Sequence, residues 1–279
     1  MSGKRSCTKK RILLFAAGTA LLLCAGLAGC SAGTQTGEDP AAGRAYLEAL
    51  ESLSPDAVTA RLKEQRHERL LAEVDELRAE LEADPDSVWE QFHDYVIFGD
   101  SRTMGFTYLD LLPEENFITA GGATILLIRT NMDALVEKNP AYIYIAFGVN
   151  DVSCGRWDTP EQYVEEYKTI LLEVHEQLPD AKIFVCSIVP VIDPAFETSA
   201  KWYNIPEFSE AVKEMCDDEE LDFVYLVDLD HLMEDYPDQY QPDGIHLVTP
   251  VYAPWAIDMI TATYNAEAEE TFAAEEAEE

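Results

Sequence analysis

The chain has 279 residues, of which 47% are hydrophobic and 26% charged, so it carries enough apolar side chains to build a folded core. Its 54 acidic side chains outnumber 19 basic ones and give a formal net charge of −35. Because a chain this acidic is repelled by nucleic acid and by anionic lipid headgroups, the composition excludes nucleic-acid binding as a function class.

The first 29 residues have the organisation of a signal peptide. A basic stretch, Lys4–Arg11, precedes an apolar stretch, Ile12–Leu23, that is short for a membrane span. The segment ends in Leu27-Ala-Gly-Cys30, which resembles a bacterial lipobox. That resemblance implies cleavage before Cys30 and a diacylglycerol on its thiol, and the alternative is an uncleaved signal anchor. Either way, the rest of the chain is expected outside the cytoplasmic membrane.

Three cysteines follow the predicted anchor, namely Cys154, Cys186 and Cys216. Their number is odd and no CxxC pair occurs, so the sequence indicates neither a zinc site nor a disulfide framework.

Two segments separate the predicted anchor from the main body. Residues 30–45 are rich in small residues and predict a flexible tether, and residues 46–94 predict a helical arm. Within the arm, Ser54-Pro-Asp56 supplies an N-cap and a first-turn proline, and Asp84-Pro85 supplies a stop. Four apolar residues recur between them at helical spacing: Leu70, Val74, Leu77 and Leu81. The arm is expected to pack on the body or act as a spacer, with a coiled-coil dimer as the alternative.

From residue 95 onward, short apolar runs alternate with helical stretches. The predicted strands are Tyr95–Phe98, Tyr142–Phe147, Ile183–Ile188 and Phe223–Val227, with Asn116–Thr119 as a weaker candidate. The predicted helices are Thr124–Lys138, Thr159–Leu178, Ile205–Glu220 and Thr249–Tyr264. This alternation predicts one α/β domain over residues 95–264, a three-layer α/β/α body around a parallel sheet. Residues 265–279 hold seven glutamates and predict a solvated acidic tail.

Four short blocks place reactive or small residues where this sheet would present them. Ligands bind beyond the carboxyl ends of strands in open parallel sheets, so residues that follow a strand reach that edge. The blocks are Phe98-Gly-Asp-Ser101-Arg102, Ala120-Gly-Gly-Ala-Thr124 and Phe147-Gly-Val-Asn150-Asp151 after the first three strands, and Asp243-Gly-Ile-His246 before the last helix. The Asp-x-x-His spacing can bring a carboxylate to one imidazole nitrogen while the other faces a substrate. A base so oriented is what a serine hydroxyl needs to act as a nucleophile.

Together the four blocks resemble those of the SGNH (GDSL-type) hydrolases, flavodoxin-like serine esterases, over residues 96–264. The resemblance implies that Ser101 is the nucleophile, His246 the general base and Asp243 its orienting partner.

The resemblance also implies an oxyanion hole and one departure from the family pattern. The hole would combine the Ser101 amide, the Gly122 amide and the Asn150 side chain, with Gly121 as the alternative glycine. Arg102 stands where the name-giving motif has leucine. We expect this change to affect the rim of the pocket rather than the chemistry.

Rival patterns are weaker. Gly29-Cys-Ser-Ala-Gly33 matches a GxSxG elbow but lies in the predicted linker without a strand or helix. A second Asp-x-x-His, Asp228–His231, leaves the fifth strand, and His246 is favoured over His231 because its block precedes the closing helix. No HExxH, P-loop or clustered metal-ligand pattern occurs, so neither a metal nor a cofactor is implied. Three aromatic residues are candidates either for a substrate groove or for packing: Trp157, Trp202 and Tyr203.

The lipobox and the hydrolase resemblance together imply a lipid-anchored, extracytoplasmic serine esterase whose ester substrate is an acylated glycan. O-acetyl groups on cell-wall or exported glycans are the preferred substrates, because many secreted members of the family act on acetylated sugars. The alternatives are a lipase or lysophospholipase, an acyltransferase, and a non-catalytic glycan-binding lipoprotein on the same fold.

Overall fold

The computed structural model describes residues 43–44 and 54–277 and divides the chain into two units, Met1–Val58 and Thr59–Glu279. The predicted signal peptide, Cys30 and most of the predicted tether lie outside the described residues. None of the described helices is both long enough and apolar enough to cross a membrane.

The second unit is built on a five-stranded parallel sheet with the strand order β2-β1-β3-β4-β5. The strands are β1 (Tyr95–Gly99), β2 (Phe117–Thr119), β3 (Tyr142–Ala146), β4 (Lys182–Cys186) and β5 (Val224–Val227). The last residue of β1, Gly99, pairs with the last residue of β2 and the last residue of β3. The carboxyl ends of β1, β2 and β3 therefore lie at one level in the sheet. The first three sequence blocks begin at these strand ends.

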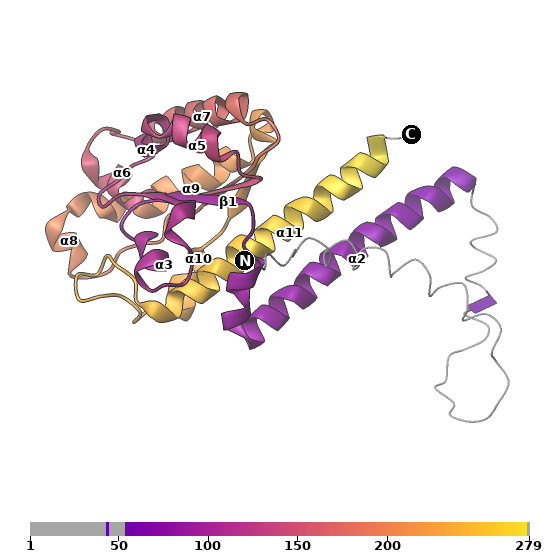
Figure 1. Ribbon diagram of the computed structural model, residues 1–279, viewed down its shortest axis with the longest axis horizontal. Helices are drawn as coiled ribbons and strands as arrows, with labels where there is room; N and C mark the ends of the chain where they lie inside the picture. The colour runs from indigo at the N-terminus through magenta and orange to yellow at the C-terminus, as the bar shows by residue number, and fades with distance from the viewer. Residues whose placement is uncertain (1–42, 45–53, 278–279) are drawn as a thin grey trace, which may run out of the picture. The chain divides into compact units, whose positions relative to one another are not determined.

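Helices cover both faces of the sheet, as the sequence predicts (Figure 1). Consecutive strand residues point to opposite faces, so Val96 and Phe98 join one hydrophobic cluster while Tyr95 and Ile97 join the other. The first face is covered by α4 (Leu126–Thr130), α5 (Met132–Lys138), α6 (Val149–Cys154), α7 (Pro160–Gln177) and α9 (Ile205–Cys216). The other is covered by α3 (Met104–Tyr108), α10 (Asp230–Asp235), α11 (Tyr252–Ala277) and the end of α2 (Pro55–Ala83). The three-layer α/β/α architecture is thus confirmed.

Short elements join the layers. They are α8 (Ala195–Thr198) and five 3₁₀ turns, η1 (Pro85–Gln91), η2 (Glu114–Asn116), η3 (Ala200–Asn204), η4 (Glu219–Leu221) and η5 (Thr249–Val251).

The predicted helix Thr124–Lys138 is divided in two in the structure. α4 ends at Thr130 and α5 starts at Met132, with Asn131 between them. The Asn131 side-chain amide donates to the Leu127 carbonyl at 2.9 Å, a bond that competes with the helix ladder. One polar side chain therefore breaks a segment whose apolar periodicity is helical throughout.

The arm helix α2 begins and ends next to the predicted signals, Ser54-Pro55 and Asp84-Pro85. Val74 and Leu81 are buried, while Leu70 and Leu77 are half-buried. Within the second unit, α2 packs against α11, since His67 stacks on Phe272 and Arg78 bonds to Asp258 at 2.8 Å. The coiled-coil dimer stays a prediction.

The predicted acidic tail is wrong for residues 265–277, because α11 continues without a break from Tyr252 to Ala277. Alanine and glutamate are strong helix formers, and Ala266 and Ala268 are buried. The glutamates have partners on the sheet: Glu267 accepts a hydrogen bond from the Tyr142 hydroxyl, and Glu270 lies 2.8 Å from the Lys182 ammonium. These contacts hold the segment in place as a continuation of the helix.

Candidate active site

Ser101 lies at the carboxyl end of β1, in the turn that leads to α3. The turn needs a glycine at position 99, because a Cβ there would lie 2.1 Å from the Thr103 hydroxyl oxygen. That hydroxyl donates to the Asp100 carbonyl at 2.7 Å, and the Asp100 carboxylate accepts the Arg102 amide at 2.9 Å. Burial raises the pKa of Asp100, and the nearby Arg102 charge opposes the rise. The loop is thus fixed by its own residues, with Ser101 exposed to the pocket.

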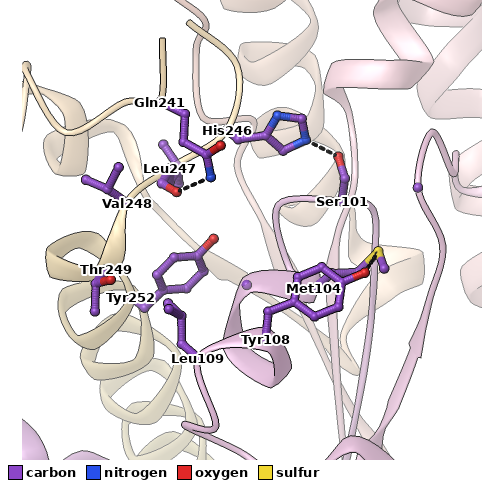
Figure 2. Close-up of a pocket in the computed structure, with 12 residues that line it drawn as sticks. Ser101, Met104, Tyr108, Leu109, Gln241, His246, Leu247, Val248, Thr249 and Tyr252 are labelled. Atoms are coloured by element: carbon purple, nitrogen blue, oxygen red, sulfur yellow. Dashed lines mark hydrogen bonds between the residues drawn. The ribbon is translucent and has the colours of Figure 1, made fainter. Parts of the chain in front are cut away.

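His246 comes from the loop that precedes η5 and reaches Ser101 across 145 residues of sequence. Its Nε2 lies 2.8 Å from the Ser101 Oγ (Figure 2). Its Nδ1 lies 2.6 Å from Asp243 Oδ2. Because the ionised carboxylate only accepts, Nδ1 carries the ring hydrogen and leaves Nε2 free to take a proton from the serine. The structure therefore brings together Ser101, His246 and Asp243, the three residues that the sequence predicts to act together.

Asp243 is itself fixed by its own turn. Its Oδ1 accepts the amides of Ile245 and His246 at 2.9 and 3.0 Å. Burial acts to raise the pKa of Asp243, but the bonds from the His246 ring and the two amides outweigh it and hold the pKa below its ordinary value. Asp243 consequently stays negative and keeps the imidazole in one tautomer.

Asn150 follows β3 and links the neighbouring loops. Its side-chain amide donates to Asp100 Oδ2 and to the Ala123 carbonyl, both at 3.1 Å. A place in an oxyanion hole would require one of these two bonds to be shared with the substrate oxygen. Gly122 is exposed, with a φ of 74°, while Gly121 lines the pocket. The oxyanion hole stays a prediction.

Asp151 has a structural part that sequence reasoning missed. Its side chain is completely buried, and its Oδ1 accepts the Ile125 amide at 2.9 Å. Burial raises its pKa to about 7, against the opposing effect of that amide bond. With Asn150 it ties the end of β3 to the glycine turn, and its place directly after Asn150 was the available signal.

The expectation that Arg102 affects the rim of the pocket is wrong, because the side chain does not lie there. The side chain is 4% exposed and points into the protein. Its guanidinium donates to the carbonyls of Ile245 (Nε, 2.9 Å), Val189 (Nη1, 2.5 Å) and Pro190 (Nη2, 3.0 Å). Buried carbonyls require donors, and a five-donor group can satisfy several at once.

Ser101 and His246 open into a pocket of about 610 Å³ (Figure 2). Apolar side chains from α3 and from the segment around η5 form much of its wall, and Gln241 and Thr249 add polar groups. The full lining comprises Ser101, Met104, Gly105, Tyr108, Leu109, Gly121, Gln241, His246, Leu247, Val248, Thr249 and Tyr252.

The aromatic candidates lie elsewhere. Trp157 and Trp202 are buried in the core, and their ring nitrogens donate to Glu166 and to the Val149 carbonyl. Tyr203 is 65% exposed and stacks on Phe196, and none of the three lines this pocket. For the two tryptophans, packing is the observed role.

In the rival Asp-x-x-His block, Asp228 and His231 bond to other residues and not to a serine nucleophile. Asp228 bonds to the Lys213 ammonium at 3.0 Å, and His231 lies 3.3 Å from Asp258. Among the residues that the structure describes, no cluster of three or more His, Cys, Asp or Glu is placed to hold a metal ion.

Comparison with known proteins adds a family match and several similar folds. Residues 97–253 match the model of the GDSL-like Lipase/Acylhydrolase family. A lipase/acylhydrolase from Enterococcus faecalis is 21% identical, covering 62% of this chain and 96% of its own, with a TM-score of 0.49. A putative GDSL-like lipase from Parabacteroides merdae is 19% identical, covering 62% and 95%, with a TM-score of 0.46. A carbohydrate esterase family 3 protein from Talaromyces cellulolyticus is 16% identical, covering 64% and 98%, with a TM-score of 0.45. No curated protein sequence matches the chain.

Proposed function

The chain belongs to the GDSL-like lipase/acylhydrolase family and is an ester-hydrolysing serine hydrolase, and on this premise we propose that Ser101, His246 and Asp243 are its catalytic triad. The observation that carries the proposal is the unbroken line of hydrogen bonds from Asp243 through His246 to Ser101, at 2.6 and 2.8 Å, opening into a pocket.

The geometry suits acyl transfer in two steps. The Ser101 Oγ attacks the ester carbonyl carbon, its proton passes to His246 Nε2, and the carbonyl π electrons move to the oxygen. The tetrahedral intermediate then expels the alcohol, which takes the proton from Nε2 and leaves an acyl-serine. Water, deprotonated by the same nitrogen, repeats the sequence on the acyl-serine and releases the acid. Asp243 stabilises the imidazolium in both steps without itself taking a proton.

The oxyanion of each intermediate needs preorganised donors, each worth about 3–4 kcal/mol of barrier. We assign the Ser101 amide, the Gly122 amide and the Asn150 side chain to this task, with Gly121 as the alternative glycine. Both glycines of this turn are exposed and Gly121 lines the pocket, which supports a role for the turn in this task.

For the substrate, we propose acetyl esters on cell-wall or exported glycans, acted on by an enzyme anchored outside the cytoplasmic membrane through Cys30. Two features favour a glycan over a membrane lipid. The net charge of −35 opposes adsorption to anionic lipid surfaces. Gln241 and Thr249 also place hydrogen-bonding groups on the pocket wall, which sugar hydroxyls can use.

A fluorophosphonate probe tests the nucleophile, since it reacts only with an activated serine. We expect the parent protein to be labelled and Ser101→Ala to abolish labelling. Ser87→Ala is the matched control, because Ser87 lies in η1 and donates to the Asp84 carbonyl away from the pocket. Labelling that persists in Ser101→Ala would remove the proposed triad.

The acyl group is tested with a series of nitrophenyl esters from acetyl to decanoyl, and with acetylated oligosaccharides. The proposal expects the highest kcat/KM for acetyl and release of acetate from the oligosaccharide. A kcat/KM that rises with chain length would instead favour the lipase alternative.

A further inference from the structure

Arg102 lies directly after the proposed nucleophile and is one of the few charged side chains buried in the described residues. Each of its donating nitrogens bonds to a different main-chain carbonyl, so the guanidinium joins backbone to backbone. Charged donors make stronger hydrogen bonds than neutral ones, and they also fix direction when three of them diverge from a rigid plane.

The three carbonyls belong to two segments, one of which carries His246. Ile245 stands inside the Asp243–His246 turn, and Val189 and Pro190 belong to the chain leaving β4. Arg102 therefore fixes both segments to the loop that carries Ser101.

The positions of these bonds matter more than their number. Ser101 and Arg102 are neighbours on one segment, and Ile245 and His246 are neighbours on the other. The Oγ–Nε2 contact of 2.8 Å and the Arg102 Nε–Ile245 carbonyl bond of 2.9 Å thus join the same two segments side by side. By contrast, the bonds that the Ile245 and His246 amides donate to Asp243 lie within one turn and do not set the distance of that turn from Ser101.

Further hydrogen bonds hold the main chain of Arg102 and the segments that it contacts. Its own carbonyl accepts the Tyr252 hydroxyl at 2.9 Å, which ties it to the start of α11. The Tyr240 hydroxyl donates to the Pro190 carbonyl at 2.8 Å, and the Ile192 amide donates to the Gly244 carbonyl at 2.9 Å. The Arg102 main chain and the segments that its guanidinium binds are therefore held by further hydrogen bonds.

We propose that Arg102 is a positioning residue, which sets the distance between His246 and Ser101 by anchoring the Ile245 carbonyl. The inference rests on the proposed triad. Arg102 departs from the family motif and does not touch the reacting atoms. The inference nevertheless gives it a part in the reaction, through the position of His246.

Substitutions at this position have different expected consequences. A lysine keeps the charge but has a single nitrogen, which cannot replace three diverging bonds. A leucine leaves the Ile245 and Val189 carbonyls without their donor, while the Pro190 carbonyl keeps its bond from the Tyr240 hydroxyl, and it is expected to destabilise the fold as well. Arg102→Lys is therefore the main variant and Arg102→Leu the stronger perturbation.

The experiment measures kcat and KM for a small acetyl ester in the full-length protein, with active sites counted by exhaustive fluorophosphonate labelling. Arg102→Lys is expected to lower kcat per labelled site by about 10- to 100-fold, because displacing a catalytic group by about an ångström has effects of this size. KM is expected to stay within about threefold, since Arg102 does not face the pocket. The control is Arg129→Lys, where Arg129 bonds to Glu166 and Glu173 on α7, and it is expected to leave both constants unchanged.

A double-mutant cycle separates positioning from general stabilisation. If Arg102 acts through His246, then adding Arg102→Lys to a His246→Ala protein should change its residual rate by less than about twofold. An equal loss in both backgrounds would overturn the inference, because Arg102 would then act independently of the base.

Three further outcomes keep this inference distinct from the proposed function. If Ser101→Ala is inactive while Arg102→Lys shows the parent kcat per labelled site, the triad stands and the inference fails. A variant that is less stable but has unchanged kcat per folded site contradicts it in the same way. If Ser101→Ala keeps the parent rate, the proposed function itself fails.

Discussion

At the scale of single residues, the choice between the two Asp-x-x-His pairs is open to a direct test. His246 meets both Asp243 and Ser101, whereas His231 meets Asp258. We expect His246→Ala to lower kcat on a small acetyl ester by several orders of magnitude, because an unassisted serine hydroxyl barely attacks an ester. His231→Ala should stay within a few-fold of the parent. The reverse result, in folded proteins, would move the base to the end of β5.

Asp151 predicts a pH dependence of stability. Its folded-state pKa is raised to about 7, while an unfolded aspartate titrates near 3.9. Between these values the folded state keeps a proton that the unfolded state has released, so the free energy of unfolding falls as pH rises, by up to about 1.4 kcal/mol per pH unit. Above pH 7 this contribution levels off.

Asp151→Asn should remove this dependence, because the amide oxygen can still accept the Ile125 amide and carries no charge to bury. The measurement is the free energy of unfolding in urea at pH 5 and pH 7.5. The difference between Asp151→Asn and the parent should shift in favour of the variant as the pH rises. Asp180→Asn, at an exposed carboxylate, is the control and should follow the parent. Parallel curves for Asp151→Asn and the parent would contradict the expected protonation.

At the scale of the elements, β1, β3 and β4 were predictable because they are buried on both faces over most of their length and therefore read as continuous apolar runs. The edge strand β2 is half-buried throughout and gives a weaker pattern. The position of Ser101 and Asn150 at one sheet edge was predictable for a related reason, since each lies a few residues after a strand that ends there. The Arg102 bonds were not predictable, because their acceptors are main-chain carbonyls and carry no sequence signal. The continuation of α11 was missed because the partners of its glutamates, such as Tyr142 and Lys182, lie far away in sequence.

The turn that carries His246 also depends on one glycine. Gly244 has a φ of 71°, and a Cβ there would lie 2.3 Å from the Ile192 carbonyl oxygen. Gly244→Ala is expected to destabilise the protein by more than the roughly 1–2 kcal/mol of left-handed strain alone and to lower activity per folded site.

Gly155→Ala is the matched control for Gly244→Ala. Its φ is 78°, but its nearest obstacle is the mobile end of the Lys201 side chain. The control should therefore lose stability from backbone strain alone and keep the parent kcat. Equal thermal shifts and equal kcat values in the two variants would show that the Ile192 clash is relieved without moving His246.

At the scale of the whole molecule, the proposed lipid anchor predicts where the protein is found. Expressed in a bacterium with its own first 29 residues, it should sediment with membranes and incorporate labelled fatty acid. Cys30→Ser should prevent acylation, because a hydroxyl cannot form the thioether, while esterase activity per molecule stays the same. A mature protein that begins elsewhere and carries no lipid would remove the anchor from the proposal.

If Ser101 and His246 act together as proposed, the 145 residues between them also govern when activity can begin. The nucleophile is synthesised early, but its base arrives only with the last loop before α11, after β3, β4 and β5 have been made. Contacts between such distant segments form late in folding, since their loop-closure cost must first be met. A partly synthesised chain would therefore hold the proposed nucleophile without its proposed base. With this triad, the enzyme would be inert toward esters during its own biosynthesis, and the onset of turnover would mark the completion of the fold.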